Sequence, residues 1–468
     1  MISRIARKEL REISRDGRYR VMAAVVLALL LLSLAVGWKK YTDLTRQHDT
    51  ARAATRAQWL NQDKKNPHSA AHYGMYAFKP TSQLAMVDTG IDPYVGVAVW
   101  MEAHKQNEFK FRPAQDRTAV QRFGEMTGAE VLQVLLPLFI VLMTFAAFSG
   151  EREQGTLRQL MSLGVPSRWL AVGKVAGTAV ALGLVLLPAT VIGVVAFLWS
   201  SGNGLLGGDV TRFAWMVAVY LVYFAALTCI GLAVSATARS SRVSLIVLLT
   251  FWFANSLVAP RAASDVAAAL HSTPSAVQFQ RALEQDLSNQ QEMARRLDVR
   301  RAALFKEHNV DSVDALPIAF SGVSLQEGEE HANEVFDKHF GRLFSLYERQ
   351  NQVLQVAGLA APMLAVRSLS MGLAGTDFNQ HRDFVNAAEQ YRRGIQRVMN
   401  ADIALNQKKG QVYLADQSLW QKVRDFEYTA PSTAWVIANC SLSLVILAGW
   451  SLGSALLLSR ATARLRVD

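Results

Sequence analysis

Cysteine is scarce in this chain, and a nucleotide-binding motif is missing from it. The 468 residues include two cysteines, Cys229 and Cys440, which both lie inside apolar runs. No disulfide framework is therefore available to the water-exposed parts, and cysteine usage does not indicate the cellular compartment. A phosphate-binding loop of the form Gly-x-x-x-x-Gly-Lys-Ser/Thr is absent, because Gly173-Lys174 is followed by Val175. We expect this chain neither to be an enzyme nor to bind ATP itself.

Charged residues are nearly absent from six long stretches of the sequence. These stretches are 21–38, 128–149, 172–199, 211–237, 243–259 and 433–458. Each is about long enough for a helix that crosses a bilayer, and 243–259 is the shortest of them. Backbone polar groups in lipid must be paired within their own segment, so we expect six transmembrane helices, with proline bends at Pro137 and Pro188. The mean hydropathy of +0.14 is too low for a chain made only of such spans, so water-exposed parts must also exist.

The first apolar stretch, 21–38, could also be a cleaved signal peptide. It is long for the apolar core of such a peptide, and Gly37-Trp38-Lys39-Lys40 lacks the small residues of a cleavage site. We therefore interpret 21–38 as a retained membrane anchor.

Lysine and arginine are concentrated on one side of the predicted topology. Six spans place both termini and the second and fourth connections on the same face of the membrane. The segments on that face contain 16 Lys or Arg against 6 Asp or Glu, whereas the whole chain has a net charge of +11. By the positive-inside rule this face is cytoplasmic, which predicts a multi-pass protein of the bacterial inner membrane with both termini in the cytoplasm. Because the charge reflects topology, we expect no binding of nucleic acid.

Two long polar segments, 39–127 and 260–432, lie on the opposite face in this topology. The second has apolar positions three and four apart on a charged background, which predicts helices. The first favours a helix followed by loops and short strands. The predicted fold is an all-α polytopic membrane protein with six transmembrane helices and two large extracytoplasmic domains, the first mixed α/β and the second mainly helical. The other predicted parts are a cytoplasmic connection at 150–171, the third to fifth spans at 172–259 and a cytoplasmic tail at 459–468.

Residues 1–20 are predicted to form an amphipathic helix at the cytoplasmic membrane surface. Apolar side chains recur with helical spacing, and basic side chains occupy much of the remaining helix surface. The residues expected at the lipid surface are Ile2, Ile5, Arg7, Lys8, Leu10 and Arg11. The alternative is a plain basic segment that only fixes the topology.

The second cytoplasmic connection, 150–171, has the pattern of a short amphipathic helix. Gly155 and Thr156 can end one helix and start another, and a proline stops the second. Leu157 and Leu160 belong to an apolar stripe that could dock into a groove of a soluble partner. The alternative is a generic loop.

The motifs of this connection resemble a known family. Glu-x-x-x-Gly-Thr-Leu at 151–157, Leu-Met-Ser-Leu at 160–163, Pro-Ser-Arg at 166–168 and Gly-Lys at 173–174 are similar to permeases of ABC-type exporters of the type V (ABC-2) class. In that family the segment is the coupling helix that contacts the nucleotide-binding subunit. The resemblance implies an ATPase contact at Glu151, Glu153, Gly155, Thr156, Leu157, Leu160 and Arg168.

The resemblance also implies partners and cofactors. An ABC ATPase dimer would bind ATP and Mg on separate chains, with no cofactor on this one, and a second permease, identical or paralogous, would pair with this chain beside membrane lipid. The segment from Ala361 to Asp377, followed by His381 and Phe384, resembles a permease subfamily with a large outer domain of unknown function.

Three clusters of reactive side chains are not expected to be sites. His68 and His72 have the spacing of neighbours on a helical face, but no third ligand lies nearby in the sequence, so we expect no metal there. A charged helical cluster is also not expected to bind metal, and its residues are His331, Glu334, Asp337 and His339. A second group has the residue types of a hydrolytic triad but no Gly-x-Ser-x-Gly turn, so we expect no catalysis there. Its residues are Ser368, Ser370, Asp377 and His381.

The expected function is that of a permease subunit that exports a substrate by using ATP hydrolysis on a separate subunit. Ionisable residues such as Glu130, Asp209 and Arg212 lie near the ends of the spans, which disfavours a proton-driven mechanism. The alternatives are a mechanotransmission complex that moves its outer domains without transport, and a membrane scaffold or sensor.

The topology can be tested with single cysteines in a chain whose Cys229 and Cys440 are replaced by serine. Ser162→Cys should resist a membrane-impermeant maleimide in spheroplasts and react once the membrane is opened, because 150–171 is predicted to be cytoplasmic. Ser288→Cys is the matched control and should react in both samples. Labelling of Ser162→Cys in sealed spheroplasts would contradict the charge-based topology.

Overall fold

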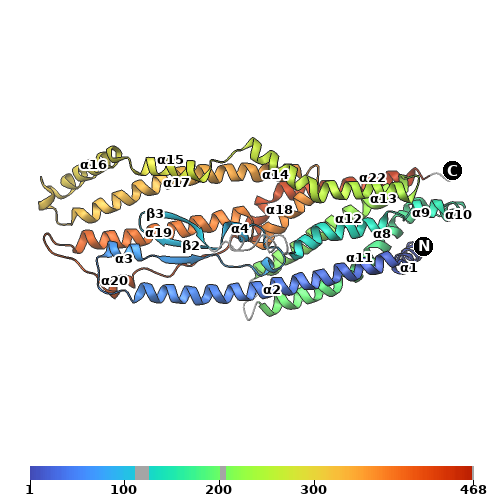
Figure 1. The fold of residues 1–468 in the computed structure, drawn as a ribbon, viewed down its shortest axis with the longest axis horizontal. Coiled ribbons are helices and arrows are strands. Elements are labelled where there is room, and N and C mark those ends of the chain that lie inside the picture. The colour runs from blue at the N-terminus through green and yellow to red at the C-terminus, as the bar shows by residue number, and fades with distance from the viewer. Residues whose placement is uncertain (111–125, 201–206, 466–468) are drawn as a thin grey trace.

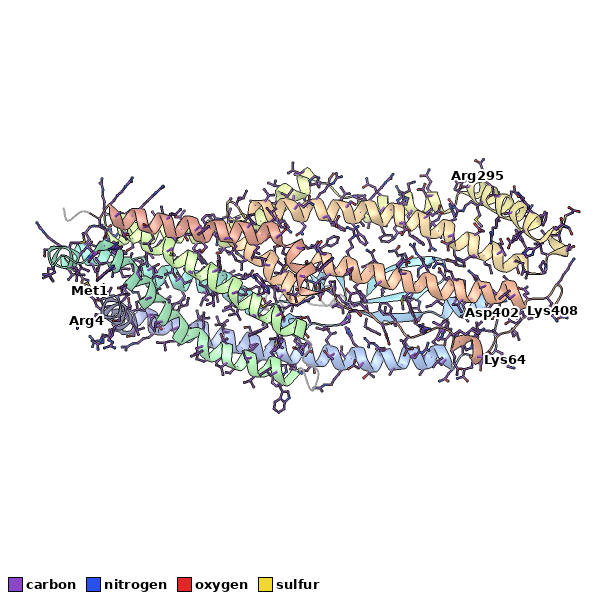
Figure 2. All side chains as sticks on the ribbon, turned by 180° about the vertical axis from the view of Figure 1, so that it is seen from behind. Met1, Arg4, Lys64, Arg295, Asp402 and Lys408 are labelled. Atoms are coloured by element: carbon purple, nitrogen blue, oxygen red, sulfur yellow. The ribbon has the colours of Figure 1, made fainter. Side chains whose placement is uncertain are left out.

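The computed structural model describes residues 1–110, 126–200 and 207–465. Positions 111–125 of the predicted first outer domain and 466–468 of the predicted tail lie outside the described residues. The described chain is mostly helical and elongated, and α1 (Ile2–Arg15) lies at the same end of the molecule as the C-terminal end of α22 (Ser441–Ala463) (Figure 1). Figure 2 shows Met1 and Arg4 at this end and Lys64, Arg295, Asp402 and Lys408 at the opposite one.

Six helices of the described residues are long and apolar enough to cross a membrane. They are α2 (Gly17–Leu60); the run of α7 (Gly128–Glu130), η2 (Val131–Leu135), α8 (Leu136–Thr144) and α9 (Ser149–Glu153); α11 (Ser167–Ser200); α12 (Gly207–Thr237); the run of α13 (Ser241–Phe253), η3 (Ala254–Val258) and α14 (Ala259–Leu270); and α22. The six predicted spans are thereby confirmed as helices of suitable length and composition. Pro137 lies in the first turn of α8, directly after the π-helical turn η2, and Pro188 lies inside α11.

The second and fourth of these helices form the centre of the bundle. In their most apolar windows, 67% and 61% of the residues are buried, whereas the value for the other four helices is between 17% and 28%. The four outer helices therefore present most of their apolar side chains outward, as expected for helices that face lipid or another membrane subunit.

The end of the molecule opposite α1, called the distal part below, contains several further helices and a small sheet. Its elements are α3 (Pro67–Tyr73), β1 (Met75–Phe78), β2 (Ala98–Glu102), β3 (Lys105–Lys110), α15 (Ala276–Leu287), α16 (Gln290–His308), η4 (Val313–Ala315), α17 (Phe320–Ala357), α19 (Phe378–Asn406) and α20 (Gln417–Trp420). The sheet is antiparallel with the order β1-β2-β3, and Met75 pairs with Met101. Of four further elements, η1 (Gln83–Met86), α4 (Asp92–Val95), α18 (Pro362–Ala374) and α21 (Thr433–Asn439), α4 and α18 lie between the distal part and the spans (Figure 1), and η1 and α21 both contact α18.

The two outer segments share one hydrophobic core in the distal part. Trp59 and Met75 from the first segment pack in the same buried cluster as Phe384 and Trp420 from the second. The indole N–H of Trp59 donates to the backbone oxygen of Trp420 at 3.0 Å, and the indole N–H of Trp420 donates to the backbone oxygen of Gln62 at 3.3 Å. The segments predicted as two domains are therefore packed together over a common core.

A buried chain of hydrogen bonds joins α18 and the turn after η1 to the central helices. Ser370 on α18 donates to Asp88 at 2.5 Å, and its hydroxyl lies 2.9 Å from that of Tyr220 on α12. The side-chain amide of Gln133 donates to Tyr220 at 3.0 Å. Burial raises the pKa of Asp88 above its ordinary value, while the Ser370 hydrogen bond opposes that shift.

Replacement of Trp420 by alanine should destabilise the distal core. The side chain is fully buried against Trp59, so Trp420→Ala is expected to cost about 3–5 kcal/mol and to lower the thermal unfolding midpoint of the purified protein. Val412→Ala is the control, because Val412 is 88% exposed in the same part and should leave the midpoint within error. Equal midpoints for the two variants would contradict the shared core.

Candidate coupling site

Helix α1 packs directly against the first turns of α11. The contact is close because α11 has glycines four residues apart on the facing side. A Cβ atom on Gly173 would lie 2.5 Å from Cγ2 of Ile5, and one on Gly177 would lie 2.7 Å from Cβ of Glu9. Small residues at this spacing let two helix backbones approach each other. The sequence Gly173-x-x-x-Gly177 therefore positions α1 along α11.

A buried ion cluster lies at the junction of α1, α9 and α11. The ammonium of Lys174, which is 1% exposed, donates to Oε2 of Glu9 at 2.6 Å and to Oε1 of Glu151 at 3.0 Å. The ammonium of Lys8 contacts the same carboxylate oxygen of Glu151. The two positive and two negative groups balance each other, which is the condition under which ions are tolerated out of water. Burial raises the pKa of Glu9, and the neighbouring Lys174 opposes this shift.

Helix α9 is also bound to the connection between α12 and α13. The guanidinium of Arg152 donates to the backbone oxygens of Ala236 at 2.7 Å and Ala238 at 2.6 Å, where α12 ends. The carboxylate of Glu153 accepts hydrogen bonds from the backbone N–H and the hydroxyl of Ser241, each at 2.8 Å. These contacts satisfy backbone groups at two helix ends and hold the predicted second and fourth connections together.

The connection between α9 and α10 (Thr156–Ser162) turns at a glycine. Gly155 has a φ of +74° in the left-handed region, which residues with a side chain rarely adopt, and a Cβ atom added there would meet no other atom within 4 Å. The predicted helix break at Gly155 and Thr156 is therefore confirmed. The hydroxyl of Thr156 donates to the backbone oxygen of Glu151 at 3.2 Å, which fixes α10 onto the end of α9.

The structure divides the predicted ATPase-contact residues into an inner and an outer group. Glu151 and Leu157 are buried, Leu157 in an apolar cluster with Phe148 and Leu170. Thr156 and Leu160 are half-buried, whereas Glu153, Gly155 and Arg168 are exposed. Three residues next to the predicted set, Arg158, Gln159 and Leu163, are exposed as well. The exposed fraction of Leu163 is 78%. The outer group and these neighbours form the surface available to a partner.

The predicted membrane-surface residues are arranged in a similar way. Ile5, Lys8 and Leu10 are half-buried because α1 packs on α11, and Ile2, Arg7 and Arg11 are exposed. Sequence reasoning missed the importance of Glu9 and Lys174. Two signals could have identified them, namely an acidic residue in a basic helix and a lysine inside an apolar stretch beside a Gly-x-x-x-Gly pattern.

The other candidate clusters have separate partners. Glu334 contacts Arg296, Asp337 contacts Arg393, and His339 contacts Asp286, so these side chains do not converge on one point. In the triad-like group, Ser370 bonds to Asp88, whereas the carboxylate of Asp377 accepts from the backbone N–H of Gln380 at the start of α19. The pair His68 and His72 is joined by a third imidazole, that of His104.

Two family models match the chain. A model described as ABC-2 family transporter protein matches residues 3–303, and a model described as a domain of unknown function, DUF3526, matches residues 276–429. The first match includes α1, the α9–α10 connection and five of the six candidate spans, and the second includes α15 to α20. A search of curated proteins found no match.

Removal of Lys174 should destabilise this end of the molecule. Lys174→Met leaves two buried carboxylates opposed by Lys8 alone, so we expect a loss of about 3–5 kcal/mol and faster proteolysis of α1. The double variant Glu9→Gln, Lys174→Met should recover part of this loss, because it removes one of the two carboxylates. Arg4→Ala at an exposed position of α1 is the control. A Lys174→Met protein with the wild-type midpoint and cleavage rate would contradict the structural role of the ion cluster.

Proposed function

The chain belongs to the ABC-2 family of transporter proteins, and on this premise we propose that it is the permease of an ATP-driven exporter whose ATPase is a separate chain. Membership implies a multi-pass membrane subunit that works with an ABC ATPase. The proposal adds that the ATPase binds the exposed surface of the α9–α10 connection in the cytoplasm. A second permease, identical or paralogous, would complete the path through the inner membrane.

The observation that supports ATPase coupling most strongly is the ion cluster of Glu9, Lys174 and Glu151. It links the connection that would contact the ATPase to α11 and to α1. Arg152 and Glu153 link the same connection to α12 and α13. A displacement of α9 by ATPase closure would therefore act on three spans at once, because the side chains that join them are paired ions and hydrogen bonds that are costly to break.

A cavity among the spans supports the handling of an apolar group. It has a volume of about 160 Å³ and lies between α2, α11 and α12, beside Met86 of η1. Its lining is apolar apart from Ser33, Thr190 and Tyr220. A cavity of about 150 Å³ with such a lining holds a benzene-sized group. An amphiphilic substrate or a lipid tail is therefore the chemistry that we propose for the exported molecule.

A second candidate function, mechanotransmission, is favoured by the length of α2. This helix continues without interruption for 44 residues, about 66 Å at the usual helical rise, from Asp16 beside α1 to the distal core around Trp59. A rigid helix of this length could move the distal part when the cytoplasmic end moves. The two functions share the same ATPase contact and differ in whether a molecule crosses the membrane.

The proposed ATPase contact can be tested with exposed residues of the α9–α10 connection. Leu163→Asp with Arg158→Glu should abolish co-purification of an ABC ATPase from the native host, because both side chains are exposed and lie outside the protein's own core. The thermal midpoint should stay unchanged. Leu157→Asp would instead unfold the apolar cluster and is unsuitable as a probe.

The matched control is Val412→Asp, an equally polar change at an exposed site of the distal part. It should leave ATPase binding and ATP hydrolysis in the complex at wild-type levels. Wild-type binding by the Leu163→Asp, Arg158→Glu protein would contradict the contact, and the lack of any ABC ATPase in the wild-type preparation would favour a scaffold or sensor.

A further inference from the structure

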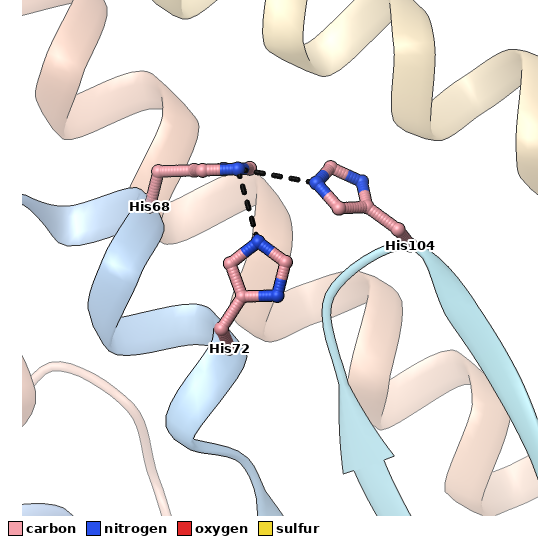
Figure 3. A group of neighbouring side chains, drawn as sticks. All are labelled: His68, His72 and His104. Carbon is pink, nitrogen blue, oxygen red and sulfur yellow. Dashed lines mark hydrogen bonds between the residues drawn. The ribbon is translucent and has the colours of Figure 1, made fainter.

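Three imidazoles converge in the distal part, far from the coupling site. His68 and His72 lie one turn apart on α3, and His104 lies at the turn between β2 and β3 (Figure 3). The Nε2 atom of His68 is 3.2 Å from Nε2 of His72 and 3.1 Å from Nε2 of His104. One ligand atom from each ring lies within 4.8 Å of the others.

Hydrogen bonding among the rings does not account well for this arrangement. A neutral imidazole nitrogen has either one proton or one lone pair, directed along a single line in the ring plane. The Nε2 atom of His68 therefore cannot form good hydrogen bonds to two other ring nitrogens at once. A shared cation accounts for both contacts, because three lone pairs can then point at one centre.

The spacing suits a tetrahedral metal ion. Zinc binds histidine nitrogens at about 2.0–2.1 Å, so two ligand nitrogens at a tetrahedral angle lie roughly 3.3 Å apart. The two Nε2 separations in the cluster are within a few tenths of an ångström of that value. Three histidines with an open fourth position are also a known zinc ligand set.

A buried carboxylate orients His104 toward the other two rings. Glu329 on α17 is fully buried, its Oε1 atom contacts Nδ1 of His104, and its Oε2 atom accepts the backbone N–H of His104 at 3.3 Å. A proton on Nδ1, beside this carboxylate, would leave the lone pair of Nε2 for the cluster, as in the carboxylate–histidine–metal arrangements of metalloproteins. Arg392 lies 3.8 Å from Glu329 and offsets its charge.

The backbone of His104 is held in an uncommon conformation at this point. Its φ is +63°, in the left-handed region, although it is not a glycine. The hydrogen bond from its N–H to Glu329 stabilises this turn, so the same carboxylate fixes both the backbone and the ring. The other cluster of metal-ligating residue types in the described part of the chain, Glu9, Glu12 and Glu151, differs because each of its carboxylates already forms an ion pair with Lys8 or Lys174.

We propose that His68, His72 and His104 bind one divalent transition-metal ion, Zn²⁺, through their Nε2 atoms, with the fourth position open to solvent. The ion would join α3 to the β2–β3 turn and, through Glu329, to α17. It would thus fasten the first outer segment to the second. The proposal does not depend on the ATPase contact or on the exported molecule.

The test uses the full-length chain, purified in detergent without a histidine tag and stripped with a chelator. Titration with Zn²⁺, followed by calorimetry and by elemental analysis after desalting, should show one Zn²⁺ per chain and a rise in the thermal midpoint. His104→Ala and His72→Gln should each lose stoichiometric binding. Glu329→Gln should weaken binding by about 10- to 100-fold while the three ligands remain.

His308→Ala is the matched control, because His308 lies on α16 outside the cluster, and it should bind Zn²⁺ as the wild type does. His72 is exposed, so the His72→Gln variant keeps the test decisive if His104→Ala does not fold. Lack of stoichiometric Zn²⁺ binding by the wild type, or unchanged binding by His72→Gln, would overturn the proposal. Binding of Cu²⁺ or Ni²⁺ alone would overturn the assignment of zinc.

Discussion

The arrangement of the end of the molecule that contains α1 depends on how the charge of Lys174 is balanced out of water. An ammonium that is 1% exposed within an apolar helix is costly unless carboxylates surround it. Glu9 and Glu151 supply them from two other helices, and the glycines of α11 allow α1 to come close enough for the contact. The three elements are consequently a single mechanical unit, since separating any one of them breaks at least one buried ion pair.

The distal part is organised by a different force, the burial of large apolar side chains contributed by both outer segments. Trp59 and Trp420 are far apart in the sequence, yet each indole donates a hydrogen bond to backbone of the other segment. The ligands of the proposed metal site belong to the first segment, and Glu329 of the second segment contacts one of them. The long helix α2 connects this part to the spans, and the hydrogen-bond chain from Asp88 to Gln133 holds α18 against the central helices. Both candidate functions therefore use one continuous structure.

Sequence reasoning succeeded where a local property decides the structure. A stretch such as 172–199 is apolar enough to require a helix in lipid whatever its neighbours are, and Gly155 indicates a helix break through its own backbone freedom. Sequence reasoning was less informative where a side chain has two plausible environments. Leu157 and Leu160 belong to one apolar stripe, but Leu157 is buried in the chain's own core and only Leu160 is partly accessible. Periodicity locates such a stripe without identifying what covers it.

The sequence by itself determined the six apolar helices, the concentration of basic residues in the connections and the motif that indicates the ABC-2 family, because these are properties of short segments. Tertiary structure alone decided the partners of polar groups. Lys174 meets a carboxylate 165 positions away, and His104 joins His68 from 36 positions away. The first pairing arises because burial makes an unpaired charge costly, and the second because the fold places the β2–β3 turn beside α3; both depend on the folded surroundings and not on neighbouring residues in the sequence.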